Sequence, residues 1–306
     1  MRIIFCLTDT KAQPWLDAFQ LAFPDDVMEQ WTPGAAPADY AVVWAPPQIF
    51  FDEQTALKGA FNIGAGVDAL AKLRLPAHLP VVRLDDAGMS VQMAEYVCHA
   101  VIRHFREFDG YEADVGAGKW SYRKPRLRSD YSVGVMGLGV LGQRVARSLA
   151  AFDFPVLGWS RSAKVLDGVR CFSGESGFDG FLANTRVLVC LLPLTPDTAN
   201  IMRRETLSKL RSGAYVINVA RGGHLVEEDL LDLIDSGHVA GATLDVFRTE
   251  PLPAGHPFWQ HPKITVTPHT SARTLRDESV AQIASKIAAL QRGEAISGVV
   301  DTGRGY

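Results

Sequence analysis

The sequence has little of what marks a secreted, membrane-spanning or nucleic-acid-binding protein. Its 306 residues include only 4 cysteines, none in a Cys-x-x-Cys pair, so we expect reduced thiols in a cytoplasmic protein and no disulfide framework or metal site. No apolar run approaches the roughly 18 residues of a membrane-spanning helix, and the opening run reaches Asp9 too early for a signal peptide. A net charge of -3 offers no basic surface for nucleic acid or for an acidic membrane. The expected partner is therefore a small molecule.

The chain does have ample apolar mass for folded cores. Hydrophobic residues make up 47% and charged residues 21%, which is ordinary globular composition. Short apolar runs alternate with helical stretches throughout, and this predicts an α/β protein whose parallel sheets carry helices on both faces. The length favours two such doubly wound domains, with 1–97 plus 275–306 as one domain and 98–274 as the other. The helical pattern at 279–293 would pack back on the first domain and make it discontinuous.

A glycine-rich turn follows the first apolar run of the second domain. The stretch GVMGLGVLGQ places Gly137, Gly139 and Gly142 in a G-x-G-x-x-G pattern, with Val140 and Leu141 inside it, after a strand and before an amphipathic helix. Glycines there let the backbone approach a pyrophosphate, and the helix N-terminus offers free amides to its charge. The pattern therefore predicts a dinucleotide site, with a tight turn that holds no ligand as the alternative.

The next strand ends in GWSRS, where such a unit normally carries an acidic residue for the adenosine ribose. Arg161 stands there instead, between Ser160 and Ser162, about 20 positions beyond the last glycine of the turn. A guanidinium makes charge-assisted bonds to a 2'-phosphate, and the two hydroxyls add donors. We therefore expect NADP(H) as the cofactor, with a surface arginine on a loop as the alternative.

An arginine follows another apolar strand, where VINVA runs into a Gly-Gly turn. A charge at a strand tip needs an anionic partner, and the strand tips of open α/β sheets bind ligands. Arg221 is therefore a candidate for binding a substrate carboxylate through both arms of its guanidinium. An internal salt bridge to Glu227 or Glu228 is the alternative.

Two further apolar strands also end in polar residues. One is followed by Asp245 and Glu250, and the other by His269. A lone histidine is more often structural than catalytic, and the other seven histidines are interpreted in that way. His269 differs because it follows a strand and a proline at a sheet tip, where a glutamate from a neighbouring tip can hold its ring and favour the imidazolium. A structural and a catalytic role stay equally open on this pattern alone.

Together these stretches resemble one family over essentially the whole chain. GLGVLGQRVA, LLPLTPDTANIM, VINVARGGHLVEEDL, LDVFRTEPLP and TVTPHTSA are similar, in order and spacing, to the D-isomer-specific 2-hydroxyacid dehydrogenases. VVWAPP, FNIGAGVDAL and DDAGMSVQMAEYV look most like the members that reduce glyoxylate and hydroxypyruvate. The resemblance implies a Rossmann cofactor domain inserted in a flavodoxin-like substrate domain, and a homodimer formed through the cofactor domain at 92–115.

The resemblance also implies roles for individual residues. It makes Arg221 the binder of the substrate carboxylate and carbonyl, Glu250 the orienter of the histidine, and His269 the acid/base. Trp44 would form a wall for the substrate, and the substrate carboxylate would be bound by the amides of Gly64, Ala65, Gly66 and Val67. The nicotinamide half of the cofactor would be lined by Leu192, Pro193, Ala220 and Asp245.

The activity implied is NADPH-dependent reduction of glyoxylate or hydroxypyruvate to the 2-hydroxy acid. Arg273 departs from the small residues familiar at its position, and it leaves the substrate preference in doubt. Two alternatives stay open: a family member that acts on a larger 2-keto acid, and a dinucleotide-sensing binding protein or corepressor on the same fold.

Overall fold

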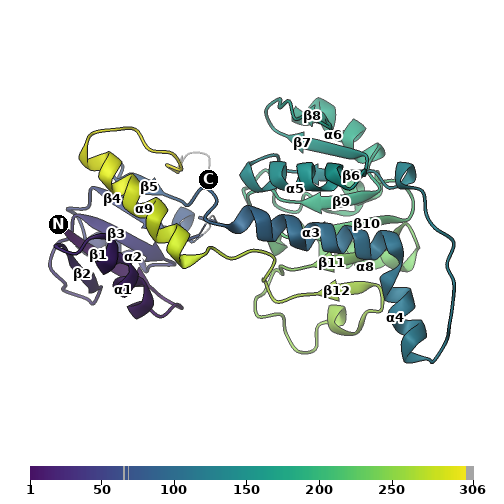
Figure 1. The fold of residues 1–306 in the computed structure, drawn as a ribbon, viewed down its shortest axis with the longest axis horizontal. Helices are drawn as coiled ribbons and strands as arrows, with labels where there is room; N and C mark the ends of the chain where they lie inside the picture. The colour runs from purple at the N-terminus through teal and green to yellow at the C-terminus, as the bar shows by residue number, and fades with distance from the viewer. Residues whose placement is uncertain (65, 68, 301–306) are drawn as a thin grey trace. The chain divides into compact units, whose positions relative to one another are not determined.

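The chain folds into two compact α/β units. The computed structural model describes residues 1–64, 66–67 and 69–300. One unit comprises Met1–Met89 with Arg273–Tyr306 and the other Ser90–Ala272, and both contain a parallel sheet, which confirms the predicted fold class (Figure 1). The sequence placed the divisions at residues 97 and 274 instead. Helix α3, Met89–Arg106, is unbroken at residue 97, so its apolar pattern gives no sign of where one unit ends.

The first unit is a five-stranded sheet in the order β2-β1-β3-β4-β5, the order of flavodoxin-like folds. Its strands are β1 Arg2–Leu7, β2 Val27–Gln30, β3 Tyr40–Trp44, β4 Gly59–Asn62 and β5 Val81–Val82. The helices are α1 Gln13–Ala22, α2 Gln48–Glu53, the 3₁₀ turn η1 Leu70–Lys72 and, from the far end of the chain, α9 Arg276–Gln291.

Helices cover both faces of this sheet because its strands are apolar on both sides. Alternate side chains of β1 and β3 point to opposite faces. One set packs with residues of α1 and α9, and the other set packs with Phe50 and Phe51 of α2. Figure 1 shows α9, in yellow, beside the strands of this unit.

The second unit is a seven-stranded sheet in the order β12-β11-β10-β9-β6-β7-β8. Its strands are β6 Val133–Met136, β7 Val156–Ser160, β8 Val169–Ser173, β9 Val187–Cys190, β10 Ala214–Asn218, β11 Val239–Leu244 and β12 Ile264–Val266. The chain runs outward from β6 to β8 and then returns to the other side of β6 as β9. The carboxyl ends of β6 and β9 are thus the switch point at which such sheets bind ligands.

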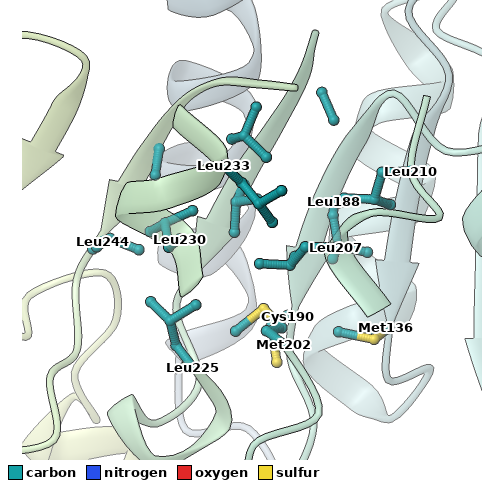
Figure 2. Packing of buried hydrophobic residues seen from close by; sticks show 14 of the residues in the cluster. Met136, Leu188, Cys190, Met202, Leu207, Leu210, Leu225, Leu230, Leu233 and Leu244 are labelled. Atoms are coloured by element: carbon teal, nitrogen blue, oxygen red, sulfur yellow. The ribbon is translucent and has the colours of Figure 1, made fainter. Parts of the chain in front are cut away.

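The helices of the second unit form a layer on each face of its sheet. They are α3, α4 Phe108–Gly116, α5 Val140–Ala151, α6 Gly174–Ala183, α7 Arg204–Leu207 and α8 Glu227–Asp235, with 3₁₀ turns η2 Arg128–Asp130, η3 Gly222–His224 and η4 Pro257–Gln260. Residues of α3 and α5 pack against Val187 and Val189 of β9. Leu188 and Cys190, the alternate residues of that strand, face the cluster made with α6, α7 and α8 (Figure 2). Among the described residues, no helix is long and apolar enough to cross a membrane.

Candidate active site

The glycine-rich turn lies at the switch point, and each of its glycines has a different structural reason. Gly137 has a φ of +105°, and a Cβ built on it would lie 2.6 Å from the carbonyl oxygen of Leu191, which follows β9. A Cβ on Gly142 would lie 1.8 Å from the carbonyl oxygen of Gly137. These two glycines therefore let the turn close and let α5 pack against it.

Gly139 has no such internal reason to be glycine. Its φ is -75°, which any residue adopts, and no atom lies within 4 Å of a Cβ built there. It is the N-cap of α5 and gives the helix no side-chain hydrogen bond, while Val140 beside it is half exposed. The turn thus presents open space directly before the first amides of a 12-residue helix.

Strand β7 ends at Ser160, beside the switch point in the sheet order. The Ser160 hydroxyl donates to the carbonyl oxygen of Ser162 at 2.8 Å, which closes the short turn that carries Arg161. Arg161 and Ser162 are exposed. The structure therefore brings the predicted cofactor-reading residues to the carboxyl edge that also carries the glycine turn.

Arg221 follows β10 at the same edge, and buried polar groups fix its backbone. Its carbonyl oxygen accepts from Asn218 Nδ2 at 3.0 Å and lies 3.0 Å from Nδ1 of His224, a fully buried side chain. The other ring nitrogen of His224 lies 3.3 Å from the carbonyl oxygen of Pro193. His224, interpreted from the sequence as structural only, thus links the Arg221 loop to the loop of Leu192 and Pro193.

Glu227, one of the two acidic residues considered as partners of Arg221, has a contact of its own. Glu227 lies 3.2 Å from His256 Nε2, and the Arg221 guanidinium donates to the carbonyl oxygen of the adjacent Ala220 at 2.6 Å. Both Leu192 and Ala220 are buried, whereas Pro193 is exposed.

His269 and Glu250 form a hydrogen-bonded pair, an arrangement that the pattern of strand tips left open and that the family resemblance implied. His269 Nδ1 lies 2.8 Å from Glu250 Oε2, and the other carboxylate oxygen accepts from the Phe247 amide at 2.9 Å. The two side chains are 44% and 36% exposed, so the ring is fixed on one side and accessible on the other. A histidine oriented in this way by a carboxylate is the usual arrangement for acid/base work.

The backbone of His269 is held in an unfavourable conformation by Asp245, the residue that directly follows β11. The φ of His269 is +52°, a left-handed value that costs a non-glycine residue about 1 to 3 kcal/mol. The His269 amide donates to the carbonyl oxygen of Asp245 at 2.8 Å. The fully buried Asp245 carboxylate accepts from Thr267 Oγ1 at 2.6 Å and from the amides of Thr270 and Ser271 at 2.8 Å each. Asp245 therefore organises the loop 267–271 that presents the histidine.

In the first unit, Trp44 and the loop that begins at Gly64 lie together. A Cβ on Gly64 would lie 2.5 Å from the Trp44 ring, so only glycine lets the loop pack against the indole. Asn62, which is buried, donates from its amide nitrogen to the carbonyl oxygens of Gly64 and Gly66 at 2.9 and 2.8 Å. Val67 is buried and Gly66 half-buried, while Ala65 lies outside the described residues.

Sequence reasoning missed Asn62, Thr267 and the linking role of His224. Asn62 stands in FNIGAG, two residues before the predicted loop, and an amide at a strand end was the available signal.

The described residues contain no group of three or more His, Cys, Asp or Glu side chains placed to hold a metal ion.

Comparison with known proteins found relatives that span the whole chain. Residues 98–271 match the family model for the D-isomer specific 2-hydroxyacid dehydrogenase NAD binding domain. A glyoxylate/hydroxypyruvate reductase A from Yersinia enterocolitica is 45% identical, with both chains covered completely. A reductase of the same name from Serratia proteamaculans is also 45% identical over the whole of both chains.

Two solved structures are similar over nearly the whole of both chains. A D-isomer specific 2-hydroxyacid dehydrogenase from Xanthobacter autotrophicus, in complex with NADPH and MES, is 41% identical with a TM-score of 0.95, covering 100% of this chain and 99% of its own. An NADPH-dependent glyoxylate/hydroxypyruvate reductase from Sinorhizobium meliloti, in complex with NADP and sulfate, is 37% identical with a TM-score of 0.94 and the same coverage. The chain belongs to the D-isomer specific 2-hydroxyacid dehydrogenase family.

Proposed function

We propose that this protein reduces glyoxylate, hydroxypyruvate or both to the 2-hydroxy acid with NADPH. The observation that carries the proposal is the His269–Glu250 pair at 2.8 Å, on the sheet edge that also presents Arg221 and the glycine turn. The full-length relatives at 45% identity are reductases of these two acids, which sets the reaction and the substrate class.

The glycine turn fits a dinucleotide phosphate. Gly139 leaves open space where a side chain would stand, before a helix whose first amides lack a side-chain cap, and such amides bind phosphate well. We assign the pyrophosphate to Gly137, Gly139, Val140, Leu141 and Gly142. When bound, NADPH supplies the hydride for the carbonyl carbon of the substrate.

The phosphate on the adenosine ribose would be bound at the end of β7. Arg161 offers a guanidinium, and Ser160 and Ser162 offer short polar side chains beside it. A carboxylate at this place would repel the 2'-phosphate, so the arginine favours NADP(H) over NAD(H). The solved relatives in complex with NADPH or NADP support this cofactor. We assign the nicotinamide end to Leu192, Pro193, Ala220 and Asp245, with Asp245 acting through its backbone and the loop that it holds.

The substrate would be bound by Arg221, whose planar guanidinium suits a carboxylate and an adjacent carbonyl oxygen. The peptide N–H groups of the loop Gly64, Ala65, Gly66 and Val67 would bind the carboxylate as well, and Trp44 would limit the size of the side chain. The backbone of this loop is held by Asn62. A short 2-keto acid is therefore the expected substrate.

Proton transfer falls to His269. Because Glu250 accepts at Nδ1, a protonated ring has its second N–H, at Nε2, available for the substrate. His269 donates this proton to the carbonyl oxygen as that oxygen becomes a hydroxyl, while Arg221 stabilises the negative charge that develops on it. Glu250 stabilises the imidazolium before the transfer and keeps the ring oriented throughout.

The catalytic assignment is tested by separating NADPH binding from turnover. His269→Ala is expected to lower kcat for glyoxylate by about 100-fold to 10,000-fold, with NADPH binding, followed by its fluorescence, unchanged. Glu250→Gln keeps most of the shape but removes the charge, and it should give a smaller loss of kcat. Normal turnover in His269→Ala would refute the assignment, and NADPH binding without turnover in the wild type would favour a sensing protein.

We propose a homodimer formed through the second unit. Helix α4 has no buried residue, and Val115, Trp120 and Tyr122 are almost fully exposed. Exposed aromatic and aliphatic side chains in one segment are typical of a protein interface. Light scattering should give a dimer for the wild type and a larger monomer fraction for Trp120→Ser.

We propose the cytoplasm as its compartment. All four cysteines are free. Burial raises the pKa of Cys6 and Cys190 to about 12 and that of Cys98 to about 11, so these thiols stay protonated and unreactive. Free thiols persist in reducing compartments.

A further inference from the structure

The loop that carries His269 is tied to helix α3 by a chain of side-chain hydrogen bonds. The Tyr96 hydroxyl on α3 bonds to Thr267 Oγ1, and Thr267 Oγ1 donates to Asp245 Oδ1 at 2.6 Å. Since Thr267 has one hydroxyl proton and gives it to the carboxylate, Tyr96 is the donor of the first bond. The same carboxylate holds the amides of the two residues that follow His269.

The Tyr96 end of this chain is firmly fixed. Its ring packs against the cluster in which Met93, Val97 and Val101 of α3 lie against the sheet and α5. Burial raises the pKa of Tyr96 to about 12, so the hydroxyl keeps the proton that it donates. Hydrogen bonds in such a chain strengthen one another, because each donor polarises the next.

We propose that Tyr96 is a positioning residue for the acid/base histidine, acting through Thr267 and Asp245 to hold the 267–271 loop in the conformation that aims the His269 ring. The proposal rests on the proposed role of His269. The left-handed backbone at His269 persists only where its surroundings fix it. Loss of the Tyr96 hydroxyl leaves Thr267 Oγ1 with one bond fewer, free to turn away from Asp245, and the loop can then relax.

The second unit offers a matched control, a second buried tyrosine that is hydrogen-bonded to a threonine. Tyr215 is buried, and its hydroxyl lies 2.9 Å from Thr243 Oγ1. Thr243 lies in β11, two residues before Asp245. Tyr215→Phe therefore removes a tyrosine–threonine hydrogen bond of the same kind from the same sheet, without touching the loop of His269.

The first measurement needs no turnover. Hydrogen exchange of the Thr270 and Ser271 amides, in the cofactor-free protein, should be about 10-fold faster in Tyr96→Phe than in the wild type, because local opening becomes easier. Tyr215→Phe should leave these amides at the wild-type rate. Unchanged exchange in Tyr96→Phe, or equal acceleration in both variants, would overturn the proposal.

The second measurement is kinetic. Tyr96→Phe should lower kcat by about 10-fold to 100-fold through misplacement of the proton donor, with little change in KM. Thr267→Val should reproduce this loss, Thr267→Ser should largely escape it, and the double variant Tyr96→Phe/Thr267→Val should be no worse than Thr267→Val alone. Additive losses of kcat in the double variant, or a wild-type kcat in Tyr96→Phe, would show that Tyr96 does not act through Thr267.

These results separate the two proposals. If the wild type reduces no 2-keto acid, the proposed function fails, and the exchange measurement alone decides whether Tyr96 anchors the loop. If turnover is normal in the wild type but exchange does not respond to Tyr96→Phe, the anchoring role fails and the proposed function stands.

Discussion

Replacement of Gly139 by alanine should weaken NADPH binding markedly without harming the fold. The φ of -75° suits alanine, and no atom lies within 4 Å of the added Cβ. Alanine at a compatible position gains about 0.4 to 1 kcal/mol because the unfolded chain loses freedom, but alanine is a poorer N-cap than glycine by a similar amount, so the stability should change little. The same methyl group would stand in the space that we assign to the pyrophosphate.

The expected loss of affinity follows from the hydrogen bonds displaced. Pushing the phosphate away from the start of α5 should cost one bond to a charged group, worth about 1.5 to 3 kcal/mol, or roughly 10-fold to 150-fold in Kd. Gly142→Ala, in contrast, should destabilise the fold itself. Its Cβ would lie 1.8 Å from the carbonyl oxygen of Gly137, and such overpacking costs about 1 to 3 kcal/mol of stability or more.

NADPH titration by fluorescence and urea unfolding, on the same preparations, check both outcomes. Gly255→Ala is the control, since its added Cβ also meets no atom within 4 Å and it lies outside the glycine turn. Wild-type NADPH affinity in Gly139→Ala would show that the pyrophosphate does not pass this residue. A stable, well-folded Gly142→Ala would contradict the packing argument.

Three more perturbations address the cofactor, the substrate and the stability. Arg161→Ala should weaken the binding of NADPH by about 5-fold to 150-fold and leave the binding of NADH almost unchanged. Equal losses of affinity for the two cofactors would show that Arg161 does not bind the 2'-phosphate. Arg221→Lys keeps the charge but loses the planar fork of the guanidinium, so for glyoxylate kcat should fall and KM should rise. Near-normal kinetics would show that the substrate carboxylate is bound elsewhere. Burial lowers the pKa of His104 to about 3, below its unfolded value, so stability should fall as pH drops below about 6.5, by about 2 kcal/mol at pH 5. His104→Phe keeps the ring stacked on Tyr215 and should flatten the dependence of urea unfolding on pH between 7 and 5; an unchanged slope would refute a neutral, buried His104.

Much of the fold and of the site could be predicted because the signals are local. The alternation of apolar runs and helices predicted two parallel sheets, and both are present. Because parallel strands end at one edge, the pattern allowed His269 and Glu250, 19 residues apart, to lie within hydrogen-bond distance, although it left their pairing open.

The parts that escaped prediction depend on contacts distant in sequence or on backbone geometry. The Tyr96–Thr267 bond joins residues 171 positions apart, and Tyr96 reads from the sequence as one more apolar residue of an amphipathic helix. The left-handed backbone of His269 has no sequence signature, because a histidine rarely adopts it. Asp245 reads as a residue that faces a ligand, whereas its carboxylate is buried and bonded to the loop of His269.

The most direct test of the central claim is the kcat/KM of the purified wild type for a series of 2-keto acids of increasing size, followed by the loss of NADPH absorbance. We expect turnover with NADPH, strongest for glyoxylate and hydroxypyruvate and falling as the side chain grows beyond what Trp44 and the Gly64 loop admit. Tight NADPH binding with no reduction of any 2-keto acid, or a clear preference for a large one, would contradict it.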